Sequence, residues 1–259
     1  MVDKNGKAFQ LRGISTHGLS WFPQYVNKKA FKTLRDEWGC NVVRLAMYTA
    51  EYNGYCTGDA NNKKQRKKLI KKGVKYATKL DMYVIIDWHI LSDNNPNMNI
   101  GEAKKFFRQM SKKYKNNDHV IYEICNEPNG DQRNGATQVS DDVNGWNRIK
   151  EYAGKVLPTI QSGDPGAVVV VGTPKWDQLI HLAAESPITG YSNLNIMYAF
   201  HVYAGDNAHM SYVSKMKTAA KSIPIFMSEW GISFSDGGLS SPDRSDVNTT
   251  NGDVVMQAC

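Results

Sequence analysis

Short apolar segments alternate with longer amphipathic segments along the chain. The short segments are rich in Val, Ile, Tyr and Phe, which strands favour, and most are bounded by polar residues. In the longer segments, apolar residues recur at helical spacing, most clearly Trp146, Ile149, Ala153 and Val156. We expect strands at 11–16, 41–48, 82–89, 120–127, 167–174, 196–203 and 223–231. We expect helices near 27–38, 61–80, 101–115, 144–162, 176–185 and 209–221.

This alternation predicts parallel strands that are covered by helices. Two architectures fit it, a doubly wound open sheet and a (β/α)8 TIM barrel. An open sheet often carries a glycine-rich phosphate-binding turn after its first strand. Here the first strand is followed by "HGLSWFPQ", which contains no such turn. We therefore expect an α/β fold of the barrel type.

Polar and aromatic side chains gather where the expected strands end, and this also favours a barrel. Functional residues of a barrel collect at the carboxyl ends of its strands. Taken singly, each such residue is more often structural, but so many at one end of the strands predict a functional site there. These residues are His17, Arg44, Tyr48, His89, Asn126, Glu127, Trp176, His201, Tyr203 and Glu229. Arg44 lies within its strand, and the others lie at or just past strand ends.

The barrel is expected to be incomplete at its C-terminal end, because an eighth strand is not seen. After Gly231 the chain is rich in Ser, Asp, Asn and Gly and shows no helical period. We divide the chain into a barrel domain, 1–238, and an irregular tail, 239–259. The alternative is that 253–259, "DVVMQAC", forms a short eighth strand.

Composition indicates a globular protein with a sizeable core, since 41% of the 259 residues are hydrophobic and 22% are charged. No apolar run is long enough for a membrane span, and "MVDKNGKAFQLRG" lacks the apolar core of a signal peptide. The net charge of +7 comes largely from 63–79. We interpret that segment as a solvated helix face, because no nucleic-acid-binding motif accompanies it.

The four cysteines have no metal-ligand spacing, and we expect no metal and no cofactor. Cys40 and Cys56 flank an expected strand, which carries the chain about 26 Å away from Cys40. The following residues would have to run almost straight back to bring the two sulfurs within bonding range. Free thiols are therefore expected.

The stretch "VIYEICNEPNG" ends an apolar run on Asn126, Glu127 and Pro128. A carboxylate at the end of a buried strand is costly unless something uses or neutralises it. Barrel closure can bring Glu127 opposite Glu229, and two facing carboxyl groups are what glycosidic bond cleavage requires. One must be protonated and the other ionised, and Arg44 and the histidines can stabilise the ionised partner.

Aromatic residues near the strand ends fit a sugar substrate, because sugar rings stack on aromatic side chains. For each single aromatic residue the alternative is packing in the core. That alternative is weaker for Trp21 and Trp176, which lie just past strand ends in loop-like sequence.

Five segments occur in order along the chain: "RLAMYT", "YVIIDWHILSDNNP", "VIYEICNEPNG", "VVGTPKW" and "IFMSEWG". Together they resemble glycoside hydrolase family 5, nearest its bacterial endo-β-1,4-glucanase branch. The resemblance runs from about residue 2 to residue 238 and implies a (β/α)8 barrel and a retaining double displacement. It implies Glu127 as general acid/base and Glu229 as nucleophile. The supporting residues that it implies are Arg44, His89, Asn126, His201 and Tyr203. The substrate-contacting residues that it implies are His17, Tyr48 and Trp176. We add Trp21 to the substrate-contacting residues because of its position in a loop.

The resemblance further implies a β-glucan substrate, a secreted monomer, and no nucleic-acid or membrane partner. The chain departs from the family after Trp230, because relatives carry an eighth strand with a tryptophan and none follows here. A non-catalytic or weakly active β-glucan-binding protein is therefore the alternative. A metal-dependent barrel hydrolase is less favoured, because the first strand ends "STHG" without a His-x-His pair. Preference among cellulose, mixed-linkage glucan, mannan and xylan stays open, since the loops decide it.

Overall fold

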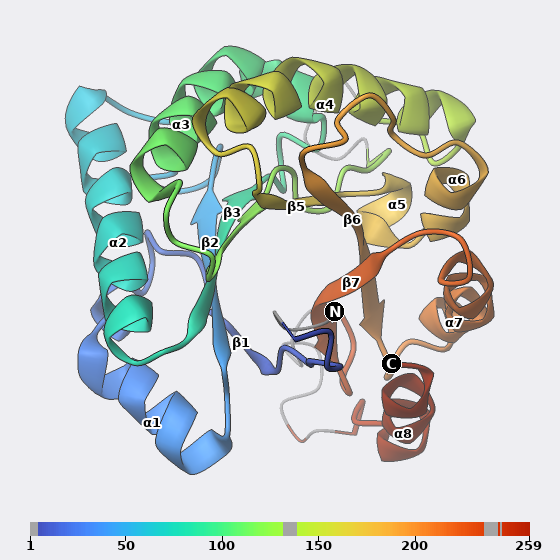
Figure 1. The fold of residues 1–259 in the computed structure, drawn as a ribbon. Coiled ribbons are helices and arrows are strands. Elements are labelled where there is room, and N and C mark those ends of the chain that lie inside the picture. The colour runs from blue at the N-terminus through green and yellow to red at the C-terminus, as the bar shows by residue number, and fades with distance from the viewer. Residues whose placement is uncertain (1–4, 132–138, 236–242, 244) are drawn as a thin grey trace.

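Seven parallel strands, arranged in the order of the sequence, form the centre of the molecule (Figure 1). The structure is a computed structural model, and it describes residues 5–131, 139–235, 243 and 245–259. Each strand pairs in parallel with the next, as a (β/α) barrel requires. The strands are β1 (Gly13–Ser15), β2 (Val42–Tyr48), β3 (Tyr83–His89), β4 (Val120–Glu123), β5 (Val168–Val171), β6 (Asn195–Tyr203) and β7 (Ile225–Gly231).

Helices surround this curved sheet on the outside (Figure 1). Several begin at an Asn or Asp whose side chain accepts a hydrogen bond from a free backbone N–H of the first turn, as Asn27 does from Ala30. None of the helices in the described part of the chain is both long and apolar enough to span a bilayer. They are α1 (Lys28–Trp38), α2 (Ala60–Lys79), α3 (Ile100–Tyr114), α4 (Val143–Gly163), α5 (Pro174–Asp177), α6 (Ile180–Glu185), α7 (Asn207–Ala219) and α8 (Thr249–Ala258), with short 3-10 helices η1 (Pro23–Tyr25) and η2 (Pro96–Asn99).

Alternation along the strands produces two apolar layers. One layer lies between the strands and the helices and contains large side chains such as Trp88 and Trp146. The other lies inside the barrel and takes one residue from each of the strands β2 to β6: Val42, Ile85, Ile121, Val170 and Ala199. Because side chains two positions apart share a face, Arg44, Asp87 and Glu123 project into the barrel above this inner layer. The fold thus places three charged side chains where water is excluded.

The barrel is open between β1 and β7. No pairing joins these two strands among the residues that the structure describes. A cavity of about 1400 Å³ opens there, and its lining includes Ile14, Phe226 and Met256. The expectation of seven strands without an eighth is thus confirmed for the described residues.

The expectation of an irregular tail over 239–259 is wrong for residues 249–258, which form α8 beside α7. The alternative of a strand at 253–259 is wrong for the same reason. The helix is short and buries only Gly252 and Val255, so its hydrophobic pattern is weak. The sequence feature that marks α8 is its N-cap residue, Asn248, whose side chain accepts a hydrogen bond from the N–H of Asn251. The domain boundary expected at 238 lies outside the described residues and stays a prediction.

Two further expectations need correction near the carboxyl end of the barrel. The single helix expected at 176–185 is divided, because Lys175, Trp176 and Asp177 have φ values of 59°, 53° and 62°. Three of the four residues of α5 are thus left-handed, and Gln178 and Leu179 separate this short turn from α6. The fourth strand ends at Glu123 rather than at 127, and Glu127 itself has a φ of 44°. The chain therefore turns sharply at the position of the expected acid/base.

Candidate active site

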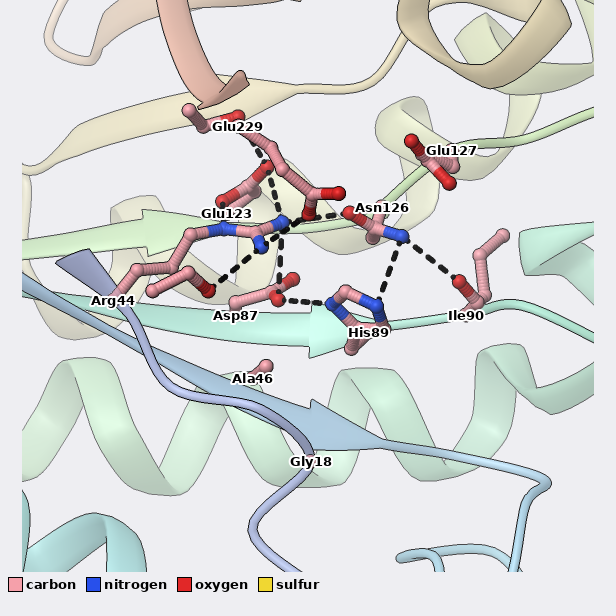
Figure 2. A network of polar contacts seen from close by, with 12 residues as sticks. Gly18, Arg44, Ala46, Asp87, His89, Ile90, Glu123, Asn126, Glu127 and Glu229 are labelled. Carbon is pink, nitrogen blue, oxygen red and sulfur yellow. Dashed lines mark hydrogen bonds and ion pairs between the residues drawn. The ribbon is translucent and has the colours of Figure 1, made fainter. Parts of the chain in front are cut away.

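The Arg44 side chain connects its own strand, β2, to three others, β3, β4 and β7, inside the barrel (Figure 2). Its Nε donates to Glu123 Oε2 at 2.7 Å, and its Nη1 donates to Glu229 Oε2 at 3.0 Å. Its Nη2 donates to Asn126 Oδ1 at 2.6 Å and lies 3.1 Å from Asp87 Oδ2. A guanidinium can serve all of these acceptors because it carries five N–H donors in a fixed plane. Arg44 therefore sets the positions of β2, β4 and β7 relative to one another at this end.

Glu229 is held in its ionised form. Arg44 donates to one carboxylate oxygen, and the hydroxyl of Tyr203 donates to the other. Burial alone would raise the pKa of Glu229. The charges of His201, Arg44 and His89, together with the hydrogen bond from Tyr203, outweigh burial and lower the pKa of Glu229 to about 2. An ionised carboxylate with fixed orientation is suited to nucleophilic attack.

Glu127 has a different environment from Glu229. It lies beside Asn126 but makes no bond to Arg44 (Figure 2). Its Oε1 lies 2.9 Å from Nδ1 of His201, and its side chain is 14% exposed. One carboxylate oxygen of Glu127 and one of Glu229 lie within 4.8 Å of each other. The structure thus brings together the two carboxylates, hereafter the carboxylate pair, that the strand ends predicted.

Asn126 and His89 connect the turn that carries Glu127 to the end of β3, where His89 is the last residue. The Nδ1 of His89 is 2.6 Å from Asp87 Oδ2, and burial raises the pKa of Asp87. Asn126 donates from Nδ2 to the carbonyl of Ile90 at 3.1 Å, and that nitrogen lies 3.3 Å from His89 Nε2. With its proton on Nδ1, His89 turns Nε2 toward this amide. Asp87 therefore fixes the orientation of His89, as a carboxylate partner commonly does.

Aromatic residues continue the site outward from His89. Tyr48 lies 4.1 Å from His89 between ring centroids, and His17 stacks on Tyr48 at 6.3 Å. Trp21 meets Tyr48 edge to face at 4.9 Å. The chain can place Trp21 there because residue 18 is glycine, where a Cβ would come within 2.3 Å of the indole. His17, Trp21 and Tyr48 thus form one aromatic wall.

Trp176 lies on another side, next to the turn that carries Glu127. Its backbone N–H donates to the carbonyl of Pro128 at 3.2 Å. The aromatic wall and Trp176 together include all four residues that the sequence predicted for substrate contact. His17 and Tyr48 line the same cavity as Glu229, and Trp21 packs against Tyr48. The roles of all four residues in substrate binding stay predictions.

Four polar residues of this network were missed by the sequence reasoning: Asp87, Glu123, Asp177 and Ser228. Glu123 pairs in register with Asp87 across β3 and β4, and both are fully buried. Burial would raise the pKa of Glu123, but the adjacent Arg44 outweighs it and lowers that pKa. The available signal was an acidic residue inside each apolar run, "YVIIDWH" and "VIYE", since such a residue needs a buried partner.

Among the residues that the structure describes, two groups of side chains are close enough for their ligand atoms to hold one ion. They are Glu123, Asp177 and His201, and Glu127, His201 and Glu229, each with atoms within 4.8 Å of one another. Their oxygens already accept hydrogen bonds from Arg44, Ser228, Tyr203 and backbone N–H groups. These side chains are thus already engaged in a network of ion pairs and hydrogen bonds.

Comparison with known proteins agrees with this geometry. The family model described as cellulase, glycosyl hydrolase family 5, matches residues 2–256. The chain belongs to glycosyl hydrolase family 5. Its barrel is therefore that of the family 5 fold, as the sequence motifs indicated.

Individual family 5 relatives cover most of this chain. It is 43% identical to endoglucanase A of Butyrivibrio fibrisolvens and 47% identical to an endoglucanase of Clostridium saccharobutylicum, over 92% of its length in each case. It covers 51% and 49% of those proteins, so the chain spans about half the length of these curated relatives. The catalytic domain of a Thermobifida fusca endoglucanase, solved in complex with cellotetraose, superposes with a TM-score of 0.80 at 31% identity, covering 99% of this chain and 77% of that one.

Proposed function

We propose that this chain is an endo-acting β-1,4-glucanase that cleaves cellulose or related β-glucans with retention of configuration. The observation that carries the proposal is the carboxylate pair, with its oxygens within 4.8 Å and with Glu229 held ionised. Retaining glycosidases place their two carboxyl groups about 5–5.5 Å apart, whereas inverting enzymes need about 6.5–9.5 Å for a water molecule. The endoglucanase relatives and the cellotetraose complex of one structural neighbour support a β-glucan as substrate.

The reaction has two displacements at the anomeric carbon. In the first, Glu229 attacks the anomeric carbon and forms an ester while Glu127 gives its proton to the departing glycosidic oxygen. In the second, water attacks the same carbon, Glu127 takes a proton from the water, and Glu229 leaves as a carboxylate. Arg44 and Tyr203 orient the Glu229 carboxylate before it attacks, and His201 contacts Glu127.

Glu127→Gln and Glu229→Gln test these roles. Each variant should lose nearly all activity on carboxymethylcellulose, measured as reducing ends, while its circular dichroism stays that of the parent. With an activated aryl β-cellobioside, whose leaving group needs little protonation, Glu127→Gln should still accumulate the covalent intermediate, detected by mass spectrometry. Glu229→Gln should not. Glu102→Gln on α3 is the matched control, because Glu102 pairs with Lys63 away from this site.

A trapped intermediate in Glu229→Gln would reverse the assignment. Proton NMR of the first product separates retention, which gives the β-anomer, from inversion, which gives the α-anomer. A panel of cellulose, mixed-linkage glucan, mannan and xylan, with products followed over time, tests both the substrate class and the endo mode of cleavage. A chain without activity on any of these polymers would contradict the proposal.

We also propose that the protein acts outside the cell, because polymeric glucan does not cross a membrane. Activity in the culture medium rather than in the cell fraction is the expected result. The monomeric state stays a prediction that size-exclusion chromatography with light scattering can test.

A further inference from the structure

Asp177 is a buried carboxylate that touches Glu127 through two routes. Its side chain is fully buried at the end of α5. Its Oδ2 accepts a hydrogen bond from the backbone N–H of Glu127 at 3.0 Å and lies 3.5 Å from Nε2 of His201. Its Oδ1 accepts from the N–H of Thr173 at 2.5 Å. One carboxylate therefore contacts both the backbone of the proposed acid/base and the ring that contacts its side chain.

The protons on His201 follow from its neighbours. Ser228 donates its hydroxyl proton to Glu123 Oε1 at 2.8 Å, so its oxygen accepts from Nε2 of His201 at 2.9 Å. The Nε2 atom therefore carries a proton. At the other ring nitrogen, Nδ1, one more proton is shared with Glu127 Oε1 at 2.9 Å. That proton lies either on Glu127 beside a neutral ring or on a positively charged ring beside the Glu127 carboxylate.

We propose that Asp177 is a positioning residue that retains this shared proton on the Glu127–His201 pair and holds Glu127 in the orientation from which it donates. The inference deepens the proposed function and rests on it, because the proton in question is the one given to the glycosidic oxygen. Negative charge beside the ring favours keeping a proton on the pair, whichever of the two groups carries it.

The charged groups around His201 agree with this role. Glu123 and Glu127 face it from β4 and the turn that follows, Asp177 from α5, and Glu229 from β7. Arg44 donates to Glu123 and Glu229, and Cys125 near Asp177 keeps its thiol proton because burial raises its pKa. Burial lowers the pKa of His201, but Asp177, Glu127 and Glu229 outweigh it and raise that pKa to about 9. Burial raises the pKa of Asp177 itself to about 7, with His201 opposing the rise.

The backbone around Asp177 is held in an unusual conformation. Lys175, Trp176 and Asp177 all have positive φ values, and left-handed backbone is unfavourable for large side chains such as Lys and Trp. The Asp177 side chain accepts hydrogen bonds from the backbone N–H groups of Thr173 and Glu127. It therefore connects this turn to the turn after β4. Strain that is maintained next to reacting groups is a common property of functional sites.

Asp177→Asn tests the proposal, because asparagine keeps the shape and one acceptor but removes the charge. His201 is followed by nitrogen NMR of the ring in labelled protein across a pH series. Its pKa should fall by about one unit or more, as expected for losing an opposite charge at this distance. The basic limb of the kcat/KM profile on a soluble β-glucan should move to lower pH in parallel. Asp93→Asn is the matched control, since Asp93 is a buried carboxylate bonded to Thr49 and Asn99.

A purely structural role for Asp177 predicts a different result. Asp177→Asn would then lower the melting temperature and the activity at every pH, with the His201 titration and the basic limb unchanged, and this outcome would overturn the proposal. If Asp177→Asn does not fold, Asp177→Ser removes the same charge from a smaller side chain and is read in the same way. The NMR titration needs no turnover, so a parent protein without activity contradicts the proposed function while the titration still decides the role of Asp177.

Discussion

Removing the Arg44 guanidinium should destabilise the fold more than any surface substitution. Arg44→Met keeps an apolar stem of similar length but leaves Asp87, Glu123 and Glu229 without their shared cation. Arg44 is 2% exposed, and Asp87 and Glu123 are not exposed at all, so solvent cannot replace the lost partner. Removing one member of a buried ion pair typically costs about 3–5 kcal/mol of unfolding free energy.

The pKa of Glu229 gives a second measure of the same effect. A fall from 4.5 to about 2 corresponds to roughly 3 kcal/mol of stabilisation at neutral pH, which His201 and His89 share with Arg44. Because the pKa of Glu229 in the folded protein is below its unfolded value, this stabilisation is present above about pH 4.5 and is lost as pH falls toward 2. The pKa of Glu123 is lowered as well, so it acts in the same direction. The difference between parent and variant should therefore be largest at pH 7 and shrink below about pH 4.5.

Urea unfolding followed by circular dichroism measures this difference without adding salt. The expected loss at pH 7 is about 3 kcal/mol or more, a large share of the roughly 5–15 kcal/mol typical of a domain. Lys155→Met is the control and should change little, because its partner Glu151 lies on the surface of α4. A loss below about 1 kcal/mol, or one that is equal at pH 7 and pH 3, would refute the assignment of Arg44 as the cation that these buried carboxylates require.

Three further predictions concern other parts of the molecule. Tyr203→Phe removes the hydroxyl that donates to Glu229 and so raises the pKa of Glu229; the acid limb of the kcat/KM profile should move to higher pH, and an unmoved limb would contradict this. Asp81 has a φ of 51° in an exposed turn, so Asp81→Gly should raise the melting temperature by about 2 °C in calorimetry and Asp81→Val should lower it. All four cysteines are free, so a thiol reagent should modify the exposed Cys259 rapidly and the buried Cys40 and Cys125 only on unfolding, and a reductant should leave the melting temperature unchanged.

Strands β2 to β6 were predictable because most of their residues are buried, so that each strand appears as a nearly continuous apolar run. The strand-end residues were predictable for a related reason, since barrel topology brings the carboxyl ends of all parallel strands to one side. The short C-terminal helix was not, because a helix that buries only Gly252 and Val255 leaves little hydrophobic period to detect. The break between α5 and α6 was missed because left-handed Lys175 and Trp176 go against the usual preferences of these residue types.

The partners of the charged residues below the site were unpredictable for a different reason. Glu123 becomes meaningful only when Arg44, 79 residues away, is placed beside it. Asp177 acts on Glu127 across 50 residues through a backbone N–H, which leaves no motif in the sequence. Local pattern identifies which residues lie at strand ends, whereas the contacts that set their charge depend on the curved arrangement of the whole sheet.

The contact between Arg44 and Glu229 spans 185 residues and has a consequence for folding kinetics. Contacts between such distant parts of a chain form late, because a long loop must close before they are made. Helices and neighbouring strands can form earlier, since their contacts are local. During refolding from urea, the helical signal should therefore return before turnover does. The time at which enzymatic activity returns therefore reports when β7 docks against β2. Bulk spectroscopy does not separate this step from the rest of folding.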